Sequence, residues 1–166
     1  MSLIDGMVME FGVASGYTIK KLAQLLPDKT IYGFDSFKGL PEDWGTQSKG
    51  AFSCPVPLDL PRNVELIVGM FEDTLPEFLL THPGVVSFVH IDCDLYSSTD
   101  CVLCNLLAFG SLCSGSVIAF DEIYNHPNYA EHEAKAFAEF LNETGFEYEC
   151  LGHSGPDSDK AIFRLI

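Results

Sequence analysis

Short apolar segments alternate along this chain with segments of helical periodicity, and this alternation restricts the fold more than any other feature. The first unit is VMEFGVASGY at residues 8–17, in which an apolar run ends in an acid, turns through two glycines and leads into the amphipathic YTIKKLAQLL. Similar apolar runs follow at 29–34, 64–69, 85–92 and 116–120. Alternating strands and helices of this kind predict an α/β fold with a doubly wound, mostly parallel sheet.

The segments between and after these strands complete the expected sheet. Helices are expected at about 17–26, within 70–82, at 97–112 and at 131–145, and the last helix begins with acids and closes at a glycine. VVSFVHID at 85–92 is the most continuously apolar strand, as expected for the centre of a parallel sheet. FEYECLG and KAIFRLI, joined by HSGPDSD, predict an antiparallel hairpin at one edge.

Composition excludes several classes of protein. The chain has 166 residues, enough for one domain with a proper core, and 24 acids against 9 bases give a net charge of −15. Such a field repels nucleic acid and anionic membrane surfaces. No apolar run approaches the roughly 20 residues that a membrane-spanning helix requires. The six cysteines lie mostly in apolar segments, which predicts reduced, buried thiols in a cytoplasmic protein.

Residues 36–63 form a long segment without a sustained period, rich in proline and glycine. Loops of this length in a compact domain are usually either functional or mobile. The segment is therefore either a lid over a ligand or a mobile excursion at the surface. Trp44, the only tryptophan, either grips a ligand or packs against its neighbours.

Acids stand at the ends of four predicted strands. They are Glu10, Asp35, Asp92 and the pair Asp121 and Glu122. One terminal acid is usually a turn or cap residue, but parallel strands bring all their carboxyl ends to the same edge, where ligands of such sheets bind. Asp35 stands at the end of the second strand, where nucleotide-binding sheets commonly hold ribose hydroxyls.

The turn after the first strand has two possible interpretations. Gly12 and Gly16 would let the backbone approach a ligand, and the free N–H groups of the following helix would face it. Taken alone, the same ten residues are also consistent with an ordinary connection between a strand and a helix.

Five segments together carry a resemblance to a known family. They are EFGVASG at 10–16, GFDSFKGLPEDW at 33–44, GMFEDTLP at 69–76, HIDCDLYSST at 90–99 and FDEIYNHP at 120–127. In this order the chain resembles the class I S-adenosylmethionine-dependent methyltransferases, and among them the macrocin O-methyltransferase family. The first segment is also similar to the corresponding turn of catechol O-methyltransferase.

The resemblance implies a Rossmann-like sheet of seven strands with helices on both faces and an antiparallel C-terminal edge strand. It implies one methyltransferase domain over residues 1–166, in which elements that usually precede the first strand are missing. The cofactor would be S-adenosylmethionine, held by ten residues: Glu10, Gly12, Ser15, Gly16, Thr18, Asp35, Ser36, Phe71, Glu72 and Asp92.

The resemblance also implies the chemistry of the site. Asp92, Asp121 and Glu122 match carboxylates that hold Mg²⁺, although Glu122 stands where many relatives carry a second aspartate, and Asp94 matches the position of a general base. The expected reaction is methylation of a hydroxyl of a small molecule, a sugar or another vicinal diol, with the metal orienting the diol. A homodimer or larger homo-oligomer is possible in such a family.

Three alternatives remain open at the level of sequence. A domain of methyltransferase type that binds without catalysing is the first. An NAD-dependent oxidoreductase is the second, although GVASG lacks the middle glycine of GxGxxG. An aspartyl phosphatase is the third, but its motif belongs on the first strand, whereas DCD at 92–94 ends the fourth.

Overall fold

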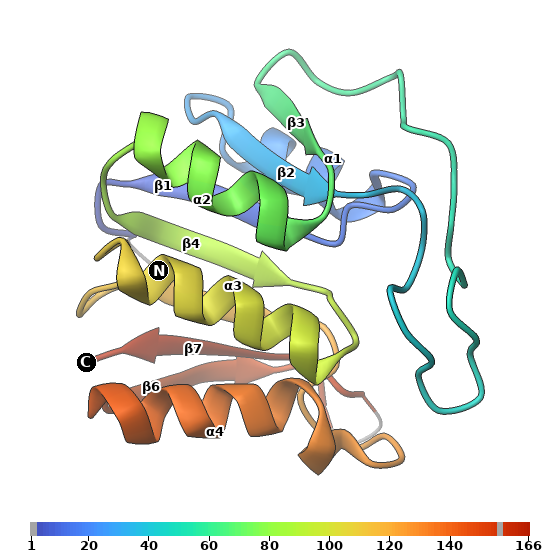
Figure 1. The fold of residues 1–166 in the computed structure, drawn as a ribbon. Helices are drawn as coiled ribbons and strands as arrows, with labels where there is room; N and C mark the ends of the chain where they lie inside the picture. Colours follow the sequence, from blue (N-terminus) through green and yellow to red (C-terminus); the bar gives the residue numbers. More distant parts are fainter. Residues whose placement is uncertain (1–2, 156–157) are drawn as a thin grey trace.

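The computed structural model describes residues 3–155 and 158–166, and these residues form a single seven-stranded sheet (Figure 1). The order across the sheet is β3-β2-β1-β4-β5-β7-β6. The strands are β1 (Met7–Phe11), β2 (Ile31–Asp35), β3 (Val64–Val68), β4 (Val86–Ile91), β5 (Val117–Phe120), β6 (Tyr148–His153) and β7 (Ala161–Leu165). The predicted α/β class and the seven-stranded Rossmann-like sheet are confirmed.

Strand direction follows the prediction and adds one detail. β1 to β5 pair in parallel, whereas β7 runs antiparallel to both β5 and β6. The last strand of the chain therefore inserts between two earlier ones, and β6 takes the outer position. Because the central strands are parallel, the carboxyl ends of β1, β2, β4 and β5 meet at one edge of the sheet.

Helices cover both faces of the sheet. Figure 1 shows α2 (Phe71–Thr81), α3 (Tyr96–Ala108) and α4 (Glu133–Thr144) in front of the sheet and α1 (Tyr17–Leu25) behind it. Each face has its own apolar core, a large one under α2, α3 and α4 and a smaller one under α1. None of the helices in the described part of the chain is long and apolar enough to cross a membrane.

Element boundaries differ from the prediction by a few residues. α3 ends at Ala108 rather than at about 112, and α4 begins at Glu133 rather than at 131. The reason at α4 is local: a 3₁₀ turn, η1 (Tyr129–Glu131), precedes the helix, and Asn128 before it has a left-handed backbone with φ 63°. The apolar period alone does not show where such a turn ends and the helix begins.

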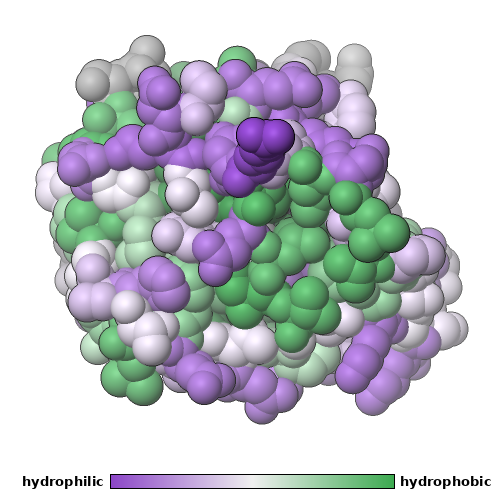
Figure 2. Space-filling view, turned by 90° about the horizontal axis from the view of Figure 1, so that it is seen from above, coloured by the Kyte–Doolittle hydropathy of each residue, from purple (hydrophilic) through white to green (hydrophobic). Residues whose placement is uncertain are grey.

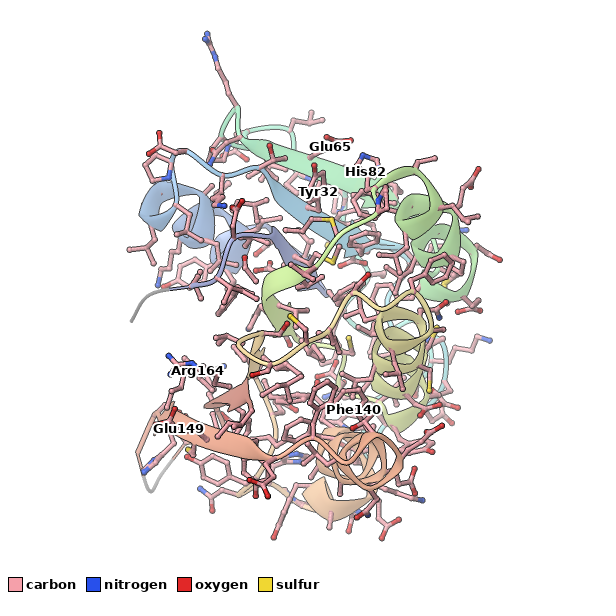
Figure 3. The ribbon with its side chains drawn as sticks, turned by 90° about the vertical axis from the view of Figure 1, so that its left-hand side faces the viewer. Tyr32, Glu65, His82, Phe140, Glu149 and Arg164 are labelled. Carbon is pink, nitrogen blue, oxygen red and sulfur yellow. The ribbon has the colours of Figure 1, made fainter. Side chains whose placement is uncertain are left out.

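The predicted hairpin of β6 and β7 is present. Glu149 and Arg164 lie directly opposite one another, and the guanidinium donates to the carboxylate at 3.1 Å (Figure 3). On the other half of the same view, Tyr32 of β2 lies beside His82, which follows α2, with ring centres 5.6 Å apart. The predicted connection at 153–159 falls partly on residues 156–157, outside the described residues.

The cysteine prediction needs a correction. All six cysteines are free, but only Cys93 is buried, and Cys104 and Cys150 are exposed. Cys104 lies on the solvent side of α3, and Cys150 lies on the outer strand β6, most of which is exposed. Apolar neighbours in sequence do not bury a residue on an outer strand or on the outer side of a helix.

One surface of the molecule is apolar over a continuous area. The view from above, toward the side on which β3 forms the edge of the sheet, shows apolar residues gathered between hydrophilic ones (Figure 2). Val68 at the end of β3 is 54% exposed. Globular proteins expose such groups routinely, so this area by itself assigns no partner.

Candidate active site

A cavity of about 310 Å³ lies beyond the carboxyl ends of the strands. Its walls come from the turns after β1, β2, β3, β4 and β5 and from the long loop at 36–63. Eight residues predicted for the site line it, namely Gly12, Asp35, Ser36, Phe71, Glu72, Asp92, Asp94 and Glu122. Five others, Glu10, Ser15, Gly16, Thr18 and Asp121, do not line it in this structure.

Position 12 must be a glycine because neighbouring backbone leaves no room for a side chain. Its φ is +89°, and a Cβ built there would lie 1.8 Å from the carbonyl oxygen of Asp92. The amide of Asp92 in turn donates to the carbonyl of Phe11 at 2.9 Å. The turn after β1 and the turn after β4 are therefore in direct contact, and the absence of a side chain at position 12 allows this.

Asp35 stabilises the same turn from the other side. One of its carboxylate oxygens accepts from the amide of Ala14 at 2.7 Å, and the other accepts from the amide of Phe37 at 2.7 Å. Ala14 has a positive φ of 44°, which is unusual for a residue with a side chain. A carboxylate has about four acceptor sites, so Asp35 can hold this turn and still accept from a ligand in the cavity.

Two acids after β4 face the cavity in unusual electrostatic surroundings. Burial and the nearby Asp121 raise the pKa of Asp92 to about 7 and that of Asp94 to about 6. The backbone of Asp94 is left-handed, with φ 61°. Glu122, after β5, has a pKa raised to about 7 by burial and by Asp94. Several carboxyl groups therefore lie close together where they are partly shielded from solvent.

His90 and Lys160 were missed by sequence reasoning. His90 Nδ1 lies 3.3 Å from Oε2 of Glu10, and its Nε2 lies 3.6 Å from Oδ1 of Asp121. Burial opposes its protonation, but Asp121 and Glu10 outweigh burial and raise the pKa of His90 to about 10. Lys160, just before β7, also forms an ion pair with Asp121. A histidine and a glutamate inside two apolar strands were the signal that could have indicated this contact.

The acids beyond β4 and β5 are compatible with a divalent cation, but the group of side chains that lie close together differs from the predicted one in its third member. Ligand atoms of His90, Asp92 and Asp121 lie within 4.8 Å of one another, but a His90 with a pKa of about 10 carries protons on both ring nitrogens at neutral pH, so of these three only the two carboxylates can bind an ion. Glu122 is outside this group, although one of its buried carboxylate oxygens has no hydrogen-bond partner among the described residues. Carboxylate oxygens are the ligands that Mg²⁺ prefers. The ammonium of Lys160 competes with such an ion for Asp121.

Glu133, the first residue of α4, was also missed. It has no exposed surface. Its Oε1 accepts from the amide of Cys93 at 3.1 Å, and its Oε2 accepts from the amide of Glu122 at 3.3 Å. Burial raises the pKa of Glu133 to about 8.

The long loop at 36–63 is anchored across the cavity. In Figure 1 it runs along the edge of the sheet where β1, β2 and β4 end. Ser97 of α3 donates to Glu42 at 2.6 Å. The ring of Trp44 lies 6.1 Å from His126 and 6.2 Å from His132, between centres. Trp44 is thus packed against neighbours, while Phe52 of the same loop lines the cavity and is 55% exposed.

The strand order with one inserted antiparallel strand, and a cavity of acids and glycines beyond β1, β2 and β4, define a class I methyltransferase. The family model described as "Methyltransferase domain" matches residues 9–123, which is more than half of the chain. The chain therefore belongs to this family and is an S-adenosylmethionine-dependent methyltransferase.

Solved structures agree with this assignment. CalS11, a TDP-rhamnose 3′-O-methyltransferase of calicheamicin biosynthesis, is 26% identical with a TM-score of 0.68 over 97% of this chain and 72% of its own. The methyltransferase PaMTH1 of Podospora anserina, bound to SAH, is 16% identical with a TM-score of 0.61, over 96% of this chain and 71% of its own.

Fibrillarin of Aeropyrum pernix with bound S-adenosyl-L-methionine is 19% identical with a TM-score of 0.56, over 98% of this chain and 67% of its own. At these levels of identity, PaMTH1 and fibrillarin support the fold alone. No curated protein is significantly similar to the chain.

Proposed function

We propose that this methyltransferase transfers a methyl group to a hydroxyl of a small molecule, a sugar or another vicinal diol, and that it belongs to the macrocin O-methyltransferase family. The observation that carries the proposal is the convergence of Asp35, Asp92, Asp94 and Glu122 on one cavity. The similarity to CalS11, whose substrate is a TDP-sugar, supports a sugar as the acceptor. The net charge of −15 disfavours a nucleic acid.

Each part of the cavity has a role in this proposal. Asp35 accepts from the ribose hydroxyls of the cofactor, with Ser36 beside it, and Phe71 and Glu72 lie against the adenine. Glu10, Gly12 and Gly16 would shape the turn against the methionine portion. Ser15 and Thr18, the latter in the first turn of α1, would lie near its carboxylate. S-adenosylmethionine supplies the methyl group, which passes from its sulfonium sulfur to the acceptor oxygen.

The acids beyond β4 and β5 serve the acceptor. Asp94 lines the cavity beside Asp92 and accepts the proton that the hydroxyl loses. Asp92 and Asp121 would hold Mg²⁺, with Glu122 as the third ligand expected from the sequence. His90 lies close to both aspartates but is protonated beside Glu10 and Asp121, so its ring nitrogens would not bind the ion. When bound, Mg²⁺ would lower the pKa of a coordinated hydroxyl. The loop at 36–63 limits access of water to this space.

Calorimetry with S-adenosylhomocysteine tests the cofactor site. Wild type should bind, and Asp35→Ala should weaken binding about tenfold or more, because it removes a charged acceptor of hydrogen bonds. Asp28→Ala, which removes an exposed acid outside the cavity, is the matched control. Unchanged affinity in Asp35→Ala would show that the ribose does not bind at Asp35.

Transfer of labelled methyl groups tests the reaction. TDP-sugars and catechols should be compared as acceptors, with Mg²⁺ or with EDTA. Activity on a TDP-sugar that EDTA removes supports the whole proposal. Activity that EDTA leaves intact refutes the role of the metal, and cofactor binding without transfer to any hydroxyl compound would favour a domain that only binds.

A further inference from the structure

We propose that Glu133 is a positioning residue, which holds the turn after β4 and the turn after β5 at a fixed separation on which methyl transfer depends. The two turns carry the acids of the cavity, and they belong to different strands. Glu133 comes from a third element, α4, and is hydrogen-bonded to both. The part of this inference that concerns turnover rests on the proposed function, whereas the part that concerns geometry does not.

The contacts connect the middle of one turn to the start of the other. Cys93, whose amide donates to Oε1 of Glu133 at 3.1 Å, stands between Asp92 and Asp94. Glu122, whose amide donates to Oε2 at 3.3 Å, directly follows Asp121. A single carboxyl group therefore spans the two backbone segments. Moving either segment would lengthen one of these hydrogen bonds.

The turn after β4 has reason to need such support. Asp94 has a left-handed backbone with φ 61°, a conformation that is uncommon and carries strain for a residue with a side chain. Strained conformations persist where the surrounding structure holds them. The amide of the residue just before Asp94 donates to Glu133, so this contact acts at the strained position.

Glu133 is itself held rigidly. Phe137, four residues later on the same face of α4, packs against Phe120 with ring centres 5.0 Å apart. Phe120 is the last residue of β5, immediately before Asp121. The helix is thus packed on the strand whose turn Glu133 binds, and the position of the carboxylate follows from the packing of the core.

Stabilisation of the helix alone does not account for this residue. An acid in the first turn favours a helix by its interaction with the helix dipole, but an exposed acid provides this as well. Glu133 is fully buried, and in the described residues no lysine, arginine or histidine forms an ion pair with it. Burial of an unpaired carboxyl group opposes folding. The hydrogen bonds to the amides of Cys93 and Glu122 are the interactions that offset the cost of burying Glu133.

The first experiment measures geometry and requires no substrate. Amide hydrogen exchange at Cys93 and Glu122 should be compared by NMR in wild type, Glu133→Gln and Glu143→Gln. The carboxamide of Glu133→Gln has a single oxygen and cannot accept at both positions, so exchange at one or both amides should become about fivefold faster or more. Glu143→Gln makes the same change at an exposed site of the same helix and should leave both amides unchanged. Unchanged exchange in Glu133→Gln would overturn the proposal.

The second experiment measures turnover and cofactor affinity. Glu133→Gln and Glu133→Asp should lower kcat about tenfold to a hundredfold, because the reacting groups are no longer held in line. Affinity for S-adenosylhomocysteine should change less than kcat. A variant with wild-type kcat but reduced thermal stability would show that Glu133 only anchors the helix, and would overturn its role in transfer.

The two experiments separate this inference from the proposed function. If wild type neither binds S-adenosylhomocysteine nor transfers a methyl group, the proposed function fails, and the exchange measurement still decides whether Glu133 holds the turns. If wild type is active and Glu133→Gln is equally active, the proposed function stands and the dependence on Glu133 is refuted.

Discussion

Gly12→Ala should destabilise the protein more than replacement of a glycine by alanine in a turn of similar backbone conformation where the new Cβ meets open space. Two costs add at this position. The left-handed backbone, with φ +89°, costs a residue with a side chain about 1–2 kcal/mol. The new Cβ would also lie 1.8 Å from the carbonyl oxygen of Asp92, a backbone atom that cannot rotate away. Overpacking of this kind costs about 1–3 kcal/mol.

The sum is on the order of 3 kcal/mol, which for a chain of this length corresponds to a fall in Tm of about 6–12 °C. Gly110→Ala is the matched control. Gly110 also has a positive φ, of +65°, but among the described residues no atom beyond its chain neighbours lies within 4 Å of the position that its Cβ would take. It should lose only the first cost, about 1–2 kcal/mol.

Urea unfolding of both variants measures these costs. Calorimetry with S-adenosylhomocysteine adds a second measurement, because the displaced Asp92 lines the cavity. Gly12→Ala should weaken binding and Gly110→Ala should not. Equal losses of stability in the two variants would refute the reasoning, since they would show that the contact between the turns after β1 and β4 yields without cost.

Two further predictions concern ion pairs. Lys160→Met should increase the affinity for Mg²⁺ or Mn²⁺ measured by calorimetry, because it removes the ammonium that competes for Asp121; weaker binding of the metal would show that Lys160 supports the site instead. Arg164→Ala should lower the free energy of unfolding by less than about 1 kcal/mol, because its pair with Glu149 is open to solvent. A loss of several kcal/mol in urea unfolding would contradict that estimate.

The sequence predicted the edge of the sheet on which the site lies. Four of the predicted strands ended in an acid, and parallel strands leave little choice about where those acids meet. Asp35, Asp92, Asp94 and Glu122 accordingly line one cavity. The repeated alternation of strand and helix was sufficient for this, because it determines the direction of each strand.

Contacts between segments far apart in the chain could not be predicted from the sequence. His90 was hidden inside an apolar strand, and only the register, which pairs it with Glu10, explains its place. Glu133 had the appearance of an ordinary acid at the start of a helix. Its partners Cys93 and Glu122 are 40 and 11 residues away. Nor did the pattern show that Gly12 faces the backbone of Asp92, because two chain segments meet there.

Because β7 lies between β5 and β6, the order in which these strands are synthesised differs from their order in the sheet. When the ribosome has released β6, the strand that will lie beside it has yet to appear, so β6 has no partner and β5 has an open edge. Pairing across this part of the sheet waits for β7, and long-range pairing of this kind slows folding. During that interval the open edge of β5 and both edges of β6 expose unpaired backbone groups, and these are the sites at which chaperones or aggregation would act first.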